Sequence, residues 1–329
     1  MKDDILPDTP AGKTLDPARR REEDLAKLGL DAFRQDLKLR GLAETTQTIT
    51  TQTVKRYCVW CLERGIDPRQ PRREDLLAYL ADLRDRMLVL RSLQKGFSCL
   101  SVWFSYLEES DQVDKNPIPA IQKRYLHSYK DEIRHRQLIS VEEAAKMVRA
   151  TIDTRDRTIL ILLFKTGIRR NELVTLDIGD INLQEQTLRL KPTAKRSNRD
   201  LFFDGETALA LHRWLRQREE RHIKKSAGKA LFIAKDGDRL GGDGVHKIVT
   251  RAAKRIGLHD PGSENLEDQF TPHCCRHFFT THLRRAGMPR EFIQELRGDK
   301  RKDAIDIYDH INQKELKESY LACIPQLGV

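Results

Sequence analysis

The stretch TPHCCRHFFTTH, residues 271–282, holds three histidines, two adjacent cysteines and an arginine within twelve positions. Threonine is a favoured N-cap residue and proline suits the first helical position, so Thr271 and Pro272 predict that a helix begins here. His273 and Arg276 are then three positions apart and share one face, close to the backbone N–H groups that favour an anion. The stretch therefore predicts a helix whose first turns bind a negatively charged group.

The same stretch has two alternative interpretations. His273 and His277 are four positions apart with Cys274 between them, so they could share a metal ion. A structural zinc site usually takes four ligands in separated pairs, however, and no second pair with such spacing stands elsewhere in this half of the chain. Cys275 lies with Phe278 on a more apolar stripe, where a free cysteine packs as a small hydrophobe. We expect core cysteines and neither metal nor cofactor, while a helix start without function remains open from this stretch alone.

Composition points to an acidic partner. The chain has 329 residues, enough for two domains, and its 60 Lys and Arg against 50 Asp and Glu give a formal net charge of +10, which favours nucleic acid. The longest purely apolar run, residues 159–164, is far shorter than the ~20 residues that span a bilayer. Residues 1–24 lack the apolar segment of a secretory signal. We expect a soluble cytoplasmic protein whose six cysteines stay reduced.

The first 132 residues read as a tail and a helical domain. Residues 1–24 are rich in Pro, Gly and charge, which predicts a flexible tail. From Thr45 on, an apolar stripe at helical spacing includes Cys58 and Cys61, so this lone C-x-x-C predicts core packing, and Gly65 ends the helix. Further helical patterns occupy residues 73–87 and 92–107. Residues 116–137 contain two prolines and little periodicity, which predicts a linker with the domain boundary near residue 132. The domains are thus 1–24, 25–132 and 133–329.

The second half mixes helices with a few strands. Ser140 and Glu143 form a capping box before a helix, and a second, apolar helix ends at Gly167. Apolar and polar residues alternate on both sides of the basic turn KPTAKRSNR, residues 191–199, which predicts a small antiparallel sheet. Most of the remainder is helical, with one β-like run at residues 230–234. The predicted class is mainly α with a small antiparallel sheet, an α+β fold.

Four segments of the chain, taken together, resemble a known family. TGIRRNELVTL, residues 166–176, resembles the T-G-x-R-x-x-E-L box of the tyrosine recombinases, the phage integrase family, and PHCCRHFFTTHLRRAG, residues 272–287, resembles their P-H-x-x-R-H-x-x-x-T-x-L box. Tyr308 in IYDHI has the position of their nucleophile, and the basic turn lies between the boxes. The N-terminal helices are similar to the family's core-binding domain. The resemblance covers nearly the whole chain after about residue 25.

The resemblance implies a role for each residue of the site. Arg169 and Arg276 would clamp the scissile phosphate, Lys195 would donate a proton, His273 would act as acid and base, and Tyr308 would attack. Guanidinium forks match phosphate oxygens and stay charged, so the site needs no metal ion. Tyrosine, with an ordinary pKa of about 10, must lose its proton during attack. The product is a 3′-phosphotyrosine bond that can be rejoined without ATP.

Some assignments stay open or depart from the family. Lys191 is an alternative to Lys195, because the length of the turn does not fix the alignment, and Tyr320 is a second candidate nucleophile. The family usually places L-G-H after its second box, with the histidine nine residues before the tyrosine, where this chain has Asp299. A carboxylate beside a phosphodiester is repulsive unless paired, so we hypothesise that Asp299 orients Arg276 or His273. Glu172 is expected to be a partner or a helix residue and not a catalyst.

The predicted activity is site-specific DNA recombination. The resemblance implies double-stranded DNA as partner, a tetramer assembled on paired sites, and accessory DNA-bending proteins, without a membrane. Two alternatives are relaxation of DNA in the manner of a topoisomerase and a DNA-binding regulator with an impaired centre. The last residues, ELKESYLACIPQLGV, have Leu316 and Tyr320 at helical spacing. This segment is expected either to dock on a neighbouring subunit or to cover the core of its own chain.

Overall fold

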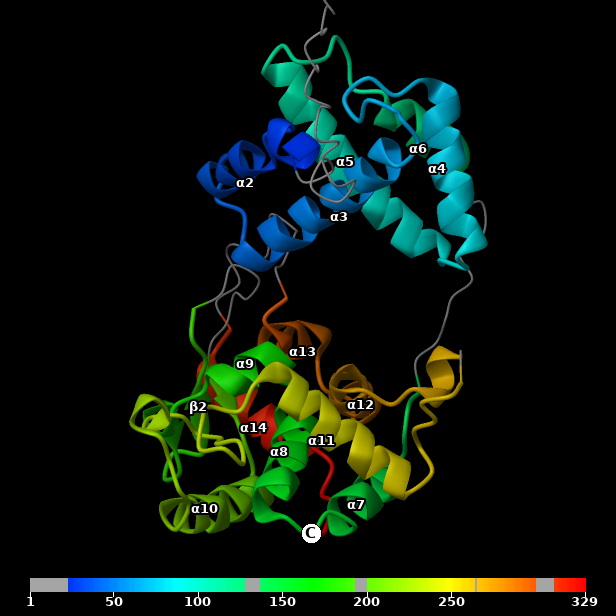
Figure 1. Ribbon diagram of the computed structural model, residues 1–329. Coiled ribbons are helices and arrows are strands. Elements are labelled where there is room, and N and C mark those ends of the chain that lie inside the picture. Colours follow the sequence, from blue (N-terminus) through cyan, green and yellow to red (C-terminus); the bar gives the residue numbers. More distant parts are fainter. Residues whose placement is uncertain (1–22, 128–136, 193–199, 264, 300–310) are drawn as a thin grey trace, which may run out of the picture. The chain divides into compact units, whose positions relative to one another are not determined.

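The computed structural model describes residues 23–127, 137–192, 200–263, 265–299 and 311–329. The chain divides into two compact units, Met1–Glu132 and Ile133–Val329, each with its own apolar core (Figure 1). The flexible tail that we predicted falls almost entirely outside the described residues, and residues 23–27 are already helical. The description below takes each unit by itself.

The first unit is helical throughout the regular elements that are described. Its helices are α2 (Leu30–Leu39), α3 (Glu44–Leu62), α4 (Arg73–Asp85), α5 (Leu90–Glu109) and α6 (Ile118–Tyr125). The stripe predicted from sequence on α3 is buried, and Gly65, at φ 67°, turns the chain away after the helix ends. Cys58 and Cys61 are fully buried in this core, and burial raises the pKa of the Cys58 thiol. The prediction that this pair serves packing is confirmed.

The segment that we predicted as a linker contains helix α6, so that prediction is wrong for residues 118–125. The side-chain oxygen of Asn116 accepts the backbone N–H of Ile118 at 3.0 Å, and its amide nitrogen donates to the carbonyl of Ser101 on α5 at 3.0 Å. Ile118 and Ile121 are buried against the core of the unit. The apolar period covers only two helical turns beside two prolines, and tertiary packing supplies the stability that this short pattern lacks.

The second unit contains most of the helices and all of the strands described. In order they are α7 (Val141–Arg149), α8 (Thr154–Thr166), α9 (Arg170–Thr175), η1 (Ile178–Asp180), β1 (Ile181–Asn182), β2 (Thr187–Arg189), β3 (Asp200–Phe202), α10 (Gly205–Glu219), η2 (Lys225–Ala227), α11 (Gly242–Arg255), η3 (Leu266–Asp268), α12 (Pro272–Arg285), α13 (Arg290–Arg297) and α14 (Gln313–Cys323). The mainly α class with a small sheet is confirmed.

The sheet is antiparallel in the order β1-β2-β3, as the alternation predicted. Leu188 on β2 pairs with Ile181 on β1 and with Leu201 on β3, which fixes the register. The β-like run predicted at residues 230–234 forms only two isolated bridges, Asp177 with Ala230 and Ile233 with Arg239. Its apolar side chains are buried, so burial and not strand pairing explains the hydrophobic pattern there.

Helix α8 is the central element of the second unit, between α10 and α12 (Figure 1). All of its residues from Thr158 to Thr166 are buried, which explains the apolar run that we found in the sequence. The ring of Phe164 packs against Phe278 of α12 with centroids 5.0 Å apart. The predicted capping box at the start of α7 is present, with Ser140 and Glu143 exchanging hydrogen bonds of 2.8 and 3.1 Å. The packing of α8 on α12 brings the two arginine-containing boxes together.

Candidate active site

Two arginines from separate helices converge on one carbonyl and one carboxylate. Arg169 is the N-cap of α9, and Arg276 lies in the second turn of α12. The carbonyl oxygen of Arg297, at the end of α13, accepts a hydrogen bond from Nη1 of Arg169 at 3.4 Å and from Nη2 of Arg276 at 2.7 Å. Oδ1 of Asp299 lies 3.3 Å from Nη2 of Arg169 and 3.4 Å from Nη2 of Arg276. The two guanidinium groups therefore lie side by side.

The side chain of Arg276 is turned into the protein and is only 5% exposed. Its Nη1 donates to the carbonyl of Gly167 at 2.7 Å, and its Nη2 donates to Arg297. Gly167 ends α8 in the left-handed conformation, with φ 57°, and a Cβ on it would lie 2.4 Å from the ring of Phe279. Glycine is thus required both for the turn and for the close approach of α12. The carbonyl that fixes Arg276 depends on that turn.

Glu172 holds Arg169. Its carboxylate accepts the backbone N–H of Arg169 at 2.9 Å and the Nη1 of the same residue at 3.0 Å, and the glutamate is 5% exposed. These contacts form a capping box at the start of α9. Its N-cap residue, Arg169, is also the cation that pairs with Glu172. The expectation that Glu172 is a partner of its neighbours is confirmed. The side chain of Arg169 remains about one third exposed.

Asp299 lies among three guanidinium groups. Helix α13 ends at Gly298, with φ 61°, and the N–H of Asp299 donates to the carbonyl of Gln294 at 3.1 Å, which fixes the backbone of the aspartate. Besides Arg169 and Arg276, Nε of Arg297 lies 2.9 Å from its Oδ2. The contact with Arg276 is the one that our hypothesis for Asp299 expected. Sequence reasoning missed Arg297, although its place two residues before Asp299 was visible.

His273 and Arg276 differ more in their surroundings than the shared helix face suggested. His273 and His277 are exposed, with ring centroids 4.8 Å apart and the planes nearly perpendicular, while Arg276 points inward. Cys274 and Cys275 are buried, and burial raises the pKa of the Cys275 thiol well above its ordinary value. Core packing of the two cysteines is confirmed. Thr271 and Pro272 begin α12 as predicted.

Lys191, the alternative proton donor, is held by two carboxylates at the end of β2. Its Nζ lies 3.0 Å from Asp177 and 3.0 Å from Asp180, and these hydrogen bonds raise the pKa of the ammonium. The predicted proton donor Lys195 and the predicted nucleophile Tyr308 lie outside the described residues. The structure therefore brings together Arg169, Arg276 and Asp299, with His273 on the first turn of α12.

Comparison with known proteins assigns the family. Residues 132–315 match the phage integrase family, and residues 30–114 match the N-terminal SAM-like domain of phage integrases. The chain is 30% identical over 258 residues to the tyrosine recombinase XerC of Pelotomaculum thermopropionicum, covering 75% of this chain and 79% of the relative. The chain belongs to the phage integrase family and is a tyrosine recombinase of the Xer type. It is an enzyme that cuts and rejoins DNA strands at specific sites.

Other relatives and solved structures agree with this family. The recombinase is 27% identical over 304 residues to tyrosine recombinase XerA of Pyrococcus horikoshii, covering 92% of this chain and 95% of the relative. Its fold is similar to the Tn1549 transposon integrase in complex with circular intermediate DNA (TM-score 0.64, 19% identity, 88% and 97% of the two chains). It is also similar to a lambda integrase dimer bound to a COC′ core site (TM-score 0.62, 18% identity, 86% and 97%). The two alternative functions, DNA relaxation and a regulator, find no support in these proteins.

Tyr320 of the recombinase cannot serve as the nucleophile. It is fully buried, its hydroxyl donates to the carbonyl of Lys165 at 2.9 Å, and burial raises its pKa well above the ordinary value. Leu316 of the same helix, α14, is also fully buried, and residues 324 and 327 join the core of the second unit. Of our two expectations for this segment, the structure shows the one in which it covers its own core.

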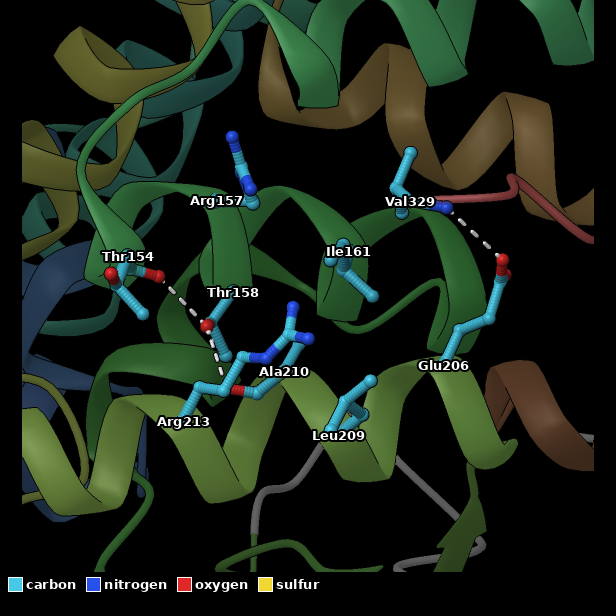
Figure 2. A pocket seen from close by; sticks show the side chains of 9 residues that line it. All are labelled: Thr154, Arg157, Thr158, Ile161, Glu206, Leu209, Ala210, Arg213 and Val329. Carbon is cyan, nitrogen blue, oxygen red and sulfur yellow. Dashed lines mark hydrogen bonds between the residues drawn. The ribbon is translucent and has the colours of Figure 1, made fainter.

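A cavity of about 60 Å³ lies between α8 and α10 of the recombinase (Figure 2). It is lined by Thr154, Arg157 and Ile161 on one side and by Leu209 and Arg213 on the other. A cavity of this size holds a water or two and no nucleotide.

Among the residues that the structure describes, no group of three His, Cys, Asp or Glu side chains could hold a metal ion. In the same residues, no helix is both long and apolar enough to cross a membrane.

Proposed function

We propose that this recombinase cleaves one DNA strand at a time by attack of Tyr308 on a phosphate held between Arg169 and Arg276. The observation that supports the proposal is the convergence of these two guanidinium groups on the same carboxylate, 3.3 and 3.4 Å from its Oδ1. Two forks of charged N–H donors that share one acceptor can bind the nonbridging oxygens of a phosphodiester. They neutralise the charge that develops during attack, and no metal ion or other cofactor is required.

The remaining roles fall to Lys195, His273 and Tyr308. Loss of the proton from Tyr308 is favoured by the neighbouring cations, and His273 on the exposed first turn of α12 accepts it. The leaving 5′ oxygen takes a proton from Lys195. Lys191 is unsuited to this step because Asp177 and Asp180 hold its ammonium and raise its pKa. A donor must release its proton readily, which a raised pKa opposes.

The proposed reaction consists of two transesterification steps, which together replace one phosphodiester bond by another. Attack forms a bond between the tyrosine oxygen and the 3′ phosphate and breaks the bond to the 5′ oxygen, which leaves as a hydroxyl. A 5′ hydroxyl from the same strand or from a partner strand then attacks the phosphotyrosine and restores tyrosine. One phosphodiester is exchanged for another of similar energy, so neither ATP nor a separate ligase is needed. Rejoining to a partner strand is recombination.

We assign double-stranded DNA as the partner, with residues 25–132 as a core-binding domain and residues 133–329 as the catalytic domain. The net charge of +10 supports contact with DNA phosphates. The Tn1549 integrase structure is a complex with circular intermediate DNA, and the lambda integrase structure is a dimer bound to a core site. We propose a tetramer on paired sites, assisted by accessory DNA-bending proteins. The enzyme acts in the cytoplasm, on the nucleoid.

A nicked duplex that traps the covalent intermediate tests this proposal. The nick lies a few nucleotides to the 3′ side of the scissile phosphate, so that the short fragment with the new 5′ hydroxyl diffuses away and the protein–DNA adduct accumulates. Wild type should form an adduct that resists denaturation, Tyr308→Phe should form none, and Tyr320→Phe should still form it. Absence of an adduct with the wild-type protein on its own target site would overturn the proposal. Strand exchange between two labelled duplexes then separates recombination from relaxation.

A further inference from the structure

The carboxylate of Asp299 joins a third arginine to the pair already described. Its Oδ1 faces Arg169 and Arg276, and its Oδ2 lies 2.9 Å from Nε of Arg297. The two oxygens of a carboxylate are only about 2 Å apart, so the three guanidinium groups surround a single anion. The side chain of Arg297 is about one third exposed, although its Nε is buried against the carboxylate.

The charges of this cluster do not balance. Arg169, Arg276 and Arg297 contribute three positive charges, while Asp299 and the buried Glu172 contribute two negative charges. Counted over these five described side chains alone, the charge is +1. A surplus cation beside a solvent-facing guanidinium is what an anionic ligand requires.

The backbone of Arg297 belongs to the same arrangement. Its carbonyl, in the last turn of α13, accepts hydrogen bonds from Arg169 and Arg276. The carbonyl of Arg297 therefore contacts both Arg169 and Arg276. Its side chain is linked to the same two residues through the carboxylate of Asp299. The family's usual L-G-H at this place has an apolar residue before the glycine and an uncharged donor after it, whereas this chain has Arg297 and Asp299 around Gly298. The two departures are joined by an ion pair.

We propose that Arg297 is a third cationic phosphate-binding residue of the recombinase, and that Asp299 is the positioning residue that holds Arg297 beside Arg169 and Arg276. In this arrangement Arg297 supplies the donor that the residue after the glycine cannot supply, because an aspartate carboxylate repels phosphate. Asp299 keeps three mutually repelling cations within reach of one phosphodiester. The inference rests on the proposed cleavage reaction and adds a residue to it.

The test compares single-turnover cleavage of an ordinary scissile phosphate with cleavage of a neutral methylphosphonate at the same position. A residue that neutralises phosphate charge matters for the first substrate and much less for the second. Arg297→Ala should slow cleavage of the phosphodiester by about 10- to 100-fold, in the range for loss of one transition-state donor or less. On the methylphosphonate the variant and wild type should differ by less than about threefold. Arg297→Lys should recover part of the rate.

Arg290→Ala is the matched control, since Arg290 is an exposed arginine at the start of the same helix. It should leave the rates on both substrates within about twofold of wild type. The inference is overturned if Arg297→Ala cleaves the phosphodiester at the wild-type rate, or if it is equally slow on both substrates, which would mark a structural role. Failure of the underlying reaction looks different, because wild type itself would then form no covalent adduct on either substrate.

Discussion

Arg276 donates a 2.7 Å hydrogen bond from Nη1 to the carbonyl of Gly167, which joins the second box of the recombinase to the end of α8. Gly167 adopts a positive φ, which sets the direction of this carbonyl. A side chain at the same position would clash with α12. The two boxes recognised in the sequence are thus parts of one contact. The geometry of the proposed phosphate-binding site thus depends on the backbone conformation of a glycine.

Gly167→Ala should therefore both destabilise the protein and impair cleavage. A Cβ would lie 2.4 Å from the ring of Phe279, and the φ of 57° is unfavourable for alanine, so we expect a loss of roughly 2–4 kcal/mol in the free energy of unfolding. Gly257→Ala is the control, because Gly257 has φ +78° and open space around its Cβ, and should lose about 1 kcal/mol. Urea unfolding of the two variants measures the difference. Equal losses would show that crowding by Phe279 does not matter.

The partner of Arg169 gives a second prediction. Glu172 is buried and accepts both the backbone N–H and the guanidinium of Arg169, so Glu172→Ala leaves an uncapped helix and a less constrained cation. We expect a loss of about 1–3 kcal/mol in the free energy of unfolding, mainly from the lost backbone cap. The lost ion pair adds little, because the side chain of Arg169 is partly exposed and solvent screens its charge. Glu172→Gln should keep the backbone bond and retain more stability than alanine. Thermal unfolding decides this, and equal melting temperatures of all three proteins would contradict it.

The two lysines of the basic turn should behave differently. Lys195→Ala should slow cleavage by about 10²–10⁴-fold, as expected for removal of a general acid, whereas Lys191→Ala should stay within about fivefold of wild type. A substrate with sulfur in place of the 5′ bridging oxygen needs no proton on its leaving group, so it should restore cleavage by Lys195→Ala. A larger defect in Lys191→Ala than in Lys195→Ala, rescued by the same sulfur, would exchange the roles of the two residues.

The C-terminal segment has a pH-dependent anchor. Burial raises the pKa of Glu206, but hydrogen bonds from Lys165 and from the backbone N–H groups of Leu327 and Gly328 outweigh it and hold that pKa below the ordinary 4.5. A lowered carboxyl pKa contributes stability that is present above the ordinary value and is lost as the pH falls through the folded value. Glu206→Gln should thus be less stable than wild type at pH 7, and the gap should narrow below about pH 4.5. Thermal melting across pH 3–7 tests this, and a gap independent of pH would refute it.

The sequence predicted the parts of the site that depend on local rules and on box order. Thr271, Pro272 and Gly167 signal helix ends by their own backbone preferences, so both boxes were placed on the correct elements. The inward turn of Arg276 was not predicted, because it depends on carbonyls of Gly167 and Arg297 that are remote in sequence. Helix α6 was missed for a similar reason, since contacts with α4 and α5 stabilise its short pattern. Arg297 escaped notice because a charged residue in the last turn of a helix is ordinary in sequence alone.

The paired departure at Arg297 and Asp299 gives the last prediction. Asp299→His alone removes the anion shared by three guanidinium groups and adds another donor, so we expect slower cleavage than in wild type. Adding Arg297→Leu to Asp299→His relieves the repulsion. The double variant then has Leu-Gly-His at residues 297–299, the sequence that the family usually has at this place. The double variant should then cleave at least about fivefold faster than Asp299→His, which is a coupling of about 1 kcal/mol between the two positions. Asp299→Ala should also be slow, because nothing then holds the three cations together. If Asp299→Ala cleaves at the wild-type rate, or if the effects of the two substitutions simply add, the carboxylate does not position the arginines.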